Sequence, residues 1–126
     1  MIRPHKQTIL LEIDNLKKYK NLIVVEGEHD RDALEKLGLE RIFILNKTGV
    51  SLFNRIDEII SLLGNKEGCV ILTDLDKKGK AYYRMIRHKL INHGLRTNDK
   101  LRGMLFRTKV SHIEGLATFL EVEELL

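Results

Sequence analysis

The chain has 126 residues, of which 43% are hydrophobic and 32% charged, as expected of one globular domain and not of a disordered chain. No uncharged apolar run approaches the ~20 residues that a bilayer requires, and the charged amphipathic start does not resemble a secretory signal, so we expect a cytoplasmic protein with no membrane segment. The single cysteine, Cys69, excludes an internal disulfide and a metal site built from cysteines.

The formal net charge is only +4, but the positive charges are clustered. Residues 77–96 carry seven Lys and Arg and no Asp or Glu, whereas acidic residues gather at 26–40 and at the C-terminus. A basic face beside an acidic one suits a polyanion held near a metal site. A solvated, lysine-rich helix face would give the same charge pattern.

Periodicity and turn signals predict helices that alternate with short strands. β-Branched runs without polar interruption are typical of parallel strands that are covered on both faces. The predicted elements, in chain order, are a helix at 8–20, a strand at 22–25, a helix at 30–39, a strand at 42–45, a helix at 51–63 capped by Ser51, a strand at 70–73, a helix at 78–93 and a short strand at 95–97.

The remaining residues, 98–126, predict further helices. Asn98 or Asp99 can cap a helix, and the motif from Ser111 to Glu114 fits a capping box that opens a last helix toward Phe119. No Pro-, Gly- or Ser-rich linker separates this part from the rest of the chain.

The alternation predicts an α/β protein with a Rossmann-like three-layer fold, in which helices flank a four-stranded, mostly parallel sheet. We expect an N-terminal helix at 1–20, the sheet domain at 21–97, and a helical extension at 98–126 packed on the same domain. The apolar N-terminal helix and the last helix also offer surfaces for a homodimer.

Acidic residues stand where the first and third predicted strands end. Ligands of open α/β sheets bind at the carboxyl ends of the strands, so Glu26, Asp74 and Asp76 are the candidate site residues. Two carboxylates two residues apart repel each other without a cation, which points to a hard divalent ion such as Mg²⁺ or Mn²⁺. Gly27 would let a phosphate approach closely, and Gly79 would let the chain turn into the basic helix.

The segment Ile23-Val24-Val25-Glu26-Gly27 with Asp30, followed by Val70-Ile71-Leu72-Thr73-Asp74-Leu75-Asp76 and Gly79, resembles the Toprim domain. That domain is shared by topoisomerases, bacterial-type primases, old-family nucleases and the 5S ribosomal RNA maturation nuclease. The resemblance covers roughly residues 20–97 and is nearest to the small, stand-alone Toprim proteins of archaea and some bacteria. A chain this short lacks the additional parts that primases and topoisomerases need.

The resemblance implies a role for each acidic position. Glu26 would bind a catalytic metal or act as general acid and base, Asp74 would ligate that metal, and Asp76 would serve a second one. One or two Mg²⁺ or Mn²⁺ ions per chain are therefore expected. Asp30 is interpreted first as a helix cap or supporting group and second as a ligand.

Several basic residues lie where they could contact nucleic-acid phosphates. Lys77, Lys78 and Lys80 follow the acidic pair directly, and Arg84 would extend the track along the helix; a solvated helix start is the alternative. Lys47 precedes Gly49 after the second strand, where a turn could hold an anion or be only a turn. The histidines at 88, 93 and 112 show no shared spacing that suggests a ligand set.

Three functions follow from these features. The first is a metal-dependent nuclease, or another phosphodiester phosphoryl-transfer enzyme, acting on RNA or DNA. The second is a non-catalytic module that binds metal and nucleic acid for a partner enzyme. The third, a phospho-receiver domain, is disfavoured because receivers carry their paired acids after the first strand rather than the third.

Overall fold

The computed structural model describes residues 5–64 and 67–124. The elements, in chain order, are α1 Lys6–Tyr19, β1 Ile23–Val25, α2 Glu28–Lys36, β2 Ile42–Ile44, α3 Leu52–Leu62, β3 Gly68–Ile71, α4 Lys77–Asn92, β4 Arg96–Thr97, α5 Lys100–Leu105, the 3₁₀ helix η1 Ile113–Gly115 and α6 Leu116–Glu124. None of the helices in these two stretches has the length and apolar character needed to cross a membrane.

The four strands form one sheet in the order β2-β1-β3-β4, and every neighbouring pair is parallel. Ile23 of β1 pairs with Ile42 on one side and Val70 on the other. The predicted α/β fold with a four-stranded sheet is therefore confirmed. Because β1 and β3 are neighbours, the residues that follow them lie at the same edge of the sheet.

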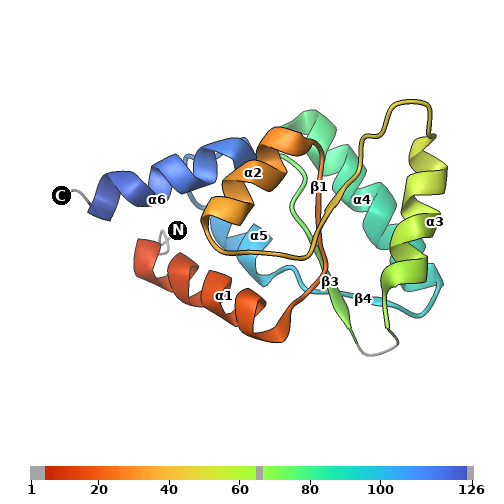
Figure 1. Ribbon diagram of the computed structural model, residues 1–126, viewed down its shortest axis with the longest axis horizontal. Helices are drawn as coiled ribbons and strands as arrows, with labels where there is room; N and C mark the ends of the chain where they lie inside the picture. The colour runs from red at the N-terminus through yellow and green to blue at the C-terminus, as the bar shows by residue number, and fades with distance from the viewer. Residues whose placement is uncertain (1–4, 65–66, 125–126) are drawn as a thin grey trace.

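Side chains of the central strands alternate between two apolar cores. Ile23 and Val25 face a core shared with α1, α2, α5 and α6, whereas Val24 faces a core shared with α3 and α4. Figure 1 shows these two groups of helices on opposite sides of the sheet, which gives the three layers. The buried strands read as continuous apolar runs because both of their faces are covered.

The observed element boundaries differ from the predicted ones by about two residues. Helix α2 begins at Glu28, not at residue 30, because the Asp30 side chain accepts a hydrogen bond from the Gly27 N–H at 3.0 Å and so belongs to the first turn. Strand β3 begins at Gly68, where it pairs with β4, and ends at Ile71.

The apolar faces that suggested a homodimer lie inside this chain. Ile9, Ile13 and Leu16 of α1 pack in the same core as Leu116 and Leu120 of α6. The apolar stripe of each helix therefore already has a partner, and the homodimer stays a prediction.

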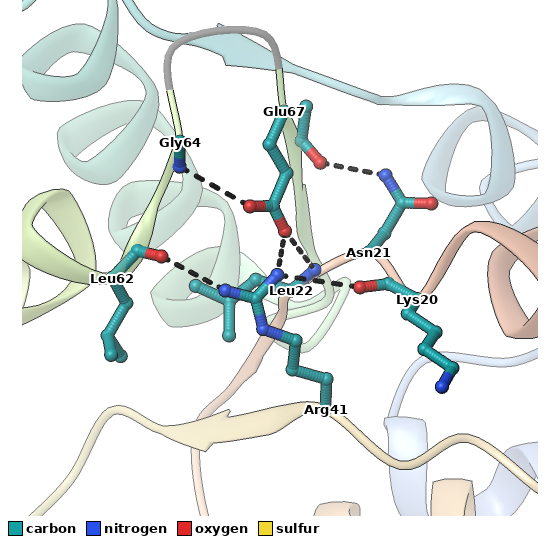
Figure 2. Close-up of polar contacts among 8 residues, drawn as sticks. Lys20, Asn21, Leu22, Arg41, Leu62, Gly64 and Glu67 are labelled. Atoms are coloured by element: carbon teal, nitrogen blue, oxygen red, sulfur yellow. Dashed lines mark hydrogen bonds and ion pairs between the residues drawn. The ribbon is translucent and has the colours of Figure 1, made fainter.

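A polar network ties the amino ends of the strands together (Figure 2). The Glu67 carboxylate pairs with the Arg41 guanidinium and also accepts from the backbone N–H groups of Leu22 and Gly64. The same guanidinium donates to the carbonyl of Leu62 at 3.0 Å. One carboxylate thus fixes the loop before β1, the loop before β2 and the end of α3.

We expect Glu67→Ala to lower the free energy of unfolding by about 1–3 kcal/mol, because it leaves a partly buried backbone donor and a guanidinium without their acceptor. Urea unfolding of the two proteins measures the difference. The control is Glu35→Ala, which removes an exposed ion pair to Arg31 and should change stability by less than about 0.5 kcal/mol. Equal effects of the two substitutions would contradict the structural role of Glu67.

Candidate functional site

The carboxyl ends of β1 and β3 bring Glu26 and Asp74 into direct contact. The Asp74 N–H donates to Glu26 Oε2 at 2.7 Å, although 48 residues separate the two in sequence. Glu26 is buried, and its other oxygen, Oε1, lies 3.9 Å from the Nζ of Lys78. The parallel pairing of β1 with β3 produces this contact.

Each of the three acidic residues uses one carboxylate oxygen to hold backbone. Glu26 Oε2 accepts from the Asp74 N–H, as described above. Asp74 Oδ1 accepts from the Ile113 N–H at 2.9 Å. Asp76 Oδ1 accepts from the Gly79 N–H at 2.8 Å and so caps α4. These bonds fix the orientation of the carboxylates. The second oxygen of each side chain takes no part in these backbone bonds.

His112 joins this group from a distant part of the chain. Ligand atoms of Asp74, Asp76 and His112 lie within 4.8 Å of one another, a spacing that one metal ion can bridge. The ring is oriented by a 2.9 Å contact between its Nδ1 and Ser111 Oγ, and its Nε2 lies 3.6 Å from Asp76 Oδ2. The spacing of the histidines along the chain carries no sign of this arrangement.

The predicted capping box at 111–114 is wrong, because contacts with other residues replace its two local hydrogen bonds. The Ser111 hydroxyl contacts the neighbouring His112 ring, and the first turn is the 3₁₀ helix η1. The Ile113 N–H finds its acceptor in Asp74, which follows β3. A long-range carboxylate thus replaces the local cap that the sequence motif indicated.

Arg102, which no sequence pattern singled out, holds the end of β3. Its buried guanidinium donates to the carbonyls of Ile71, Thr73 and Asp74 at 3.3, 2.6 and 3.1 Å and stacks 4.5 Å from the centre of the Tyr83 ring. Burial lowers the pKa of this guanidinium, and the nearby negative groups oppose that shift. Arg102 therefore sets the path of the backbone that carries the acidic pair.

Gly79 allows α4 to approach the same backbone. A Cβ at this position would collide with the carbonyl group of Asp74, so no other residue fits without movement. The Gly79 carbonyl also accepts from the Thr73 hydroxyl at 2.7 Å. Gly27 differs, since its backbone is extended and a Cβ would meet only ordinary contact with Asp30.

The environment of the site strengthens the binding of a proton by Glu26. Desolvation by burial raises the pKa of Glu26, and the charges of Asp74 and Asp76 add to the rise, while the hydrogen bond from Asp74 N–H and the charge of Lys78 oppose it. Burial likewise raises the pKa of Asp30, against the hydrogen bond from Gly27. A cation would relieve this crowding of negative charge.

The basic residues predicted to contact phosphates are divided between two places. Lys77, Lys78 and Lys80 are exposed in the first turn of α4, beside the acidic group, and Arg84 follows one turn later. Arg84 borders a cavity of about 470 Å³ together with Tyr83, Arg87, His88, Ile91 and Asp99. Lys47 lies in the turn after β2, where Gly49 has a φ of 80°, and in the described part of the chain no contact links it to the carboxylates.

The chain resembles proteins that carry the name UPF0292. It is 32% identical over 101 residues to such a protein of Methanocaldococcus jannaschii, which is 77% of this chain and 76% of the relative. A UPF0292 protein of Methanosarcina barkeri is 31% identical over 116 residues, covering 90% of this chain and 78% of the relative. No protein-family model matches the chain.

Two further similarities concern a named ribonuclease and a solved structure. Ribonuclease M5 of Mycoplasma capricolum is 30% identical over 88 residues, which is 67% of this chain but only 49% of that protein. A solved structure described as a putative protein from Aquifex aeolicus superposes with a TM-score of 0.71 at 23% identity, covering 86% of this chain and 94% of that one. The last similarity shows a shared fold.

We expect Gly79→Ala to lower the free energy of unfolding by about 1–3 kcal/mol, because the added methyl group collides with the Asp74 carbonyl. Thermal or urea unfolding measures the loss. Gly103→Ala is the matched control: Gly103 also lies in a helix, an added methyl group would have nothing within 4 Å, and Ala should stabilise by up to about 1 kcal/mol. An unchanged free energy of unfolding in Gly79→Ala would contradict the close approach of α4 to the Asp74 carbonyl.

We expect Glu26→Gln to stabilise the protein in EDTA at neutral pH, because it removes a desolvated charge and keeps an acceptor for the Asp74 N–H. The raised pKa means that folded Glu26 binds its proton more tightly than unfolded Glu26, so the stability of the unaltered protein falls as pH rises through that raised pKa. The gain from Gln should therefore vanish near pH 4 and be complete at pH 8.

Urea unfolding across this pH range, with exposed Glu40→Gln as the control, measures that dependence. A gain that does not depend on pH would contradict the raised pKa of Glu26.

Proposed function

The chain belongs to the UPF0292 protein family, and from this premise we propose that it is a Toprim-type nuclease that uses Mg²⁺ or Mn²⁺ to cleave phosphodiester bonds in RNA or DNA. The observation that carries the proposal is the meeting of Asp74, Asp76 and His112 within 4.8 Å, directly beside the buried Glu26. The similarity to a protein named ribonuclease M5 supports this class of activity and favours RNA as the polymer.

The donor set fits a divalent cation. Carboxylate oxygens are the ligands that Mg²⁺ and Mn²⁺ prefer, and one imidazole is more readily accepted by Mn²⁺ than by Mg²⁺. Asp74, Asp76 and His112 would hold the ion, and Glu26 would hold a second ion or stay a proton carrier. A bound ion of this kind polarises a phosphoryl oxygen and lowers the pKa of a water molecule.

The protein groups around this position supply the remaining parts of a hydrolytic step. Glu26, whose pKa is raised by burial, can take a proton from the attacking water and return one to the departing ribose oxygen. Lys78, 3.9 Å from Glu26 Oε1, can neutralise a phosphate oxygen. Arg102 keeps the backbone of Asp74 fixed while the phosphate is bound.

The exposed first turn of α4 extends the site toward the rest of the polymer. Lys77 and Lys80 would contact phosphates there, and Arg84 would continue the track one turn further. Gly27, which carries no side chain at the mouth of β1, leaves room for a backbone phosphate, while Lys47 and Gly49 border the same sheet edge. The proposal implies that the protein acts in the cytoplasm and that its partner is a nucleic acid.

A second candidate function is a non-catalytic module that binds metal and nucleic acid for a partner enzyme. The observation that favours it is the double use of the carboxylates, since each one already holds a backbone N–H. A structural role of this kind requires the acidic residues even where no bond is cleaved.

The test is a cleavage assay on end-labelled structured RNA, single-stranded DNA and duplex DNA, each with Mg²⁺, Mn²⁺ or EDTA. We expect metal-dependent cleavage that falls at least about 100-fold in Glu26→Gln and Asp76→Asn proteins that remain folded. We also expect His112→Ala to weaken Mn²⁺ binding about tenfold in calorimetry. His93→Ala, an exposed histidine that contacts the Lys89 carbonyl, is the control for binding.

The outcomes separate the two functions. Binding of metal and nucleic acid without cleavage would support the non-catalytic module. Binding of neither would overturn both functions, and equal Mn²⁺ affinity of His112→Ala and the unaltered protein would remove His112 from the metal centre.

A further inference from the structure

We propose that the ring of Phe106 is a stacking platform for an unpaired base, so that the nucleic acid entering the site is a single strand. This inference rests on the proposed function and deepens it by naming the form of the substrate. The platform lies at the end of α5, and the observations that carry it are the exposure of the ring, its rigid support and the charge beside it.

Phe106 is a large apolar side chain that the fold leaves 48% exposed. It follows the last residue of α5, and its N–H donates to the Arg102 carbonyl at 3.1 Å, which closes the helix. The backbone at this position is therefore fixed while the ring is open to solvent. Single exposed apolar residues are common, so exposure needs a further observation to carry meaning.

That observation is the support beneath the ring. The Arg102 guanidinium lies 5.4 Å from the centre of the Phe106 ring and 4.5 Å from that of Tyr83. The guanidinium itself is immobilised by three carbonyls at the end of β3, among them that of Asp74 at 3.1 Å. Arg102 thus links the exposed Phe106 ring to the backbone of Asp74, one of the acidic residues of the site.

A phosphate-binding group stands next to the ring. Lys80 Nζ lies over the Phe106 ring, 5.5 Å from its centre, and Lys80 belongs to the first turn of α4, which Asp76 caps. A nucleotide presents a flat base and a phosphate a few ångströms apart. A base that stacks on Phe106 would take the place of the Lys80 ammonium, which its flexible side chain can carry to the adjoining phosphate. Asp76, one of the acidic residues, lies four residues before Lys80 as the cap of the same helix.

An aromatic platform selects for the form of the strand, not for its sequence. In a duplex the faces of the bases are covered by their neighbours, whereas an unpaired base can place its face on a side chain. Every base has such a face, so the contact tolerates any sequence. The platform predicts that loops, tails and frayed ends bind better than uninterrupted duplex.

The chain contains no tryptophan, which makes Phe106→Trp a specific reporter of stacking. We would titrate this protein with oligouridylate, oligothymidylate and a blunt duplex, in Ca²⁺ to slow cleavage and with gel analysis of each oligonucleotide afterwards. We expect the single strands to quench the Trp fluorescence and the duplex to leave it nearly unchanged. Comparing the affinities for oligouridylate and oligothymidylate shows whether the protein prefers RNA or DNA.

Phe53→Trp is the matched control. Phe53 is 64% exposed on α3, and Lys89 Nζ lies 3.2 Å from its ring centre, so it shares the exposure and the neighbouring lysine but lies on the other layer. We expect no quenching there. Equal quenching at both positions would show that the signal is not specific to the site and would overturn the platform.

Affinity provides the second readout. We expect Phe106→Leu, which keeps an apolar cover over Arg102, to weaken single-strand binding about tenfold and to leave duplex binding unchanged. Unchanged single-strand affinity would overturn the platform, although metal-dependent cleavage by the unaltered protein would still sustain the proposed function. Absence of nucleic-acid binding by the unaltered protein with metal would overturn the proposed function and the platform together.

Discussion

A buried guanidinium decides the shape of the sheet edge on which the candidate chemistry depends. Arg102 is 2% exposed and donates hydrogen bonds to three carbonyl groups at the carboxyl end of β3. Together with the bond from the Asp74 N–H to Glu26, these three bonds fix the backbone that leads from β3 to the acidic pair. The cost of burying a cation is offset because its donors meet carbonyls and the site around it is acidic.

The acidic residues are part of the same construction. Glu26 receives the Asp74 N–H, and Asp74 in turn receives the N–H of Ile113. The carboxylates thus stabilise the backbone that positions them, and these hydrogen bonds partly offset the repulsion between the like charges. Such a site is organised before any ligand arrives, which lowers the cost of binding one.

The fold could be predicted from the sequence because its signals are local. Ile23, Val24 and Val25 form a covered strand, and Ser51 caps α3 by accepting from the Asn54 N–H at 3.1 Å, as its position in sequence indicates. The parallel order then fixes which strand ends meet. From the sequence, Glu26 and Asp74 come together only if the first and third strands are neighbours, and the observed strand order supplies that condition.

The other groups of the site come from beyond the last strand. His112, the Ile113 N–H and Arg102 reach the acidic edge by tertiary packing, which no spacing in the sequence encodes. Residues 21–97 contain the four strands of the sheet but neither Arg102 nor His112. A gene fragment limited to these residues would carry Glu26, Asp74 and Asp76 into another protein without the guanidinium, the imidazole and the backbone amide that contact them here, so the recombined sheet would keep its carboxylates and lose the groups packed around them.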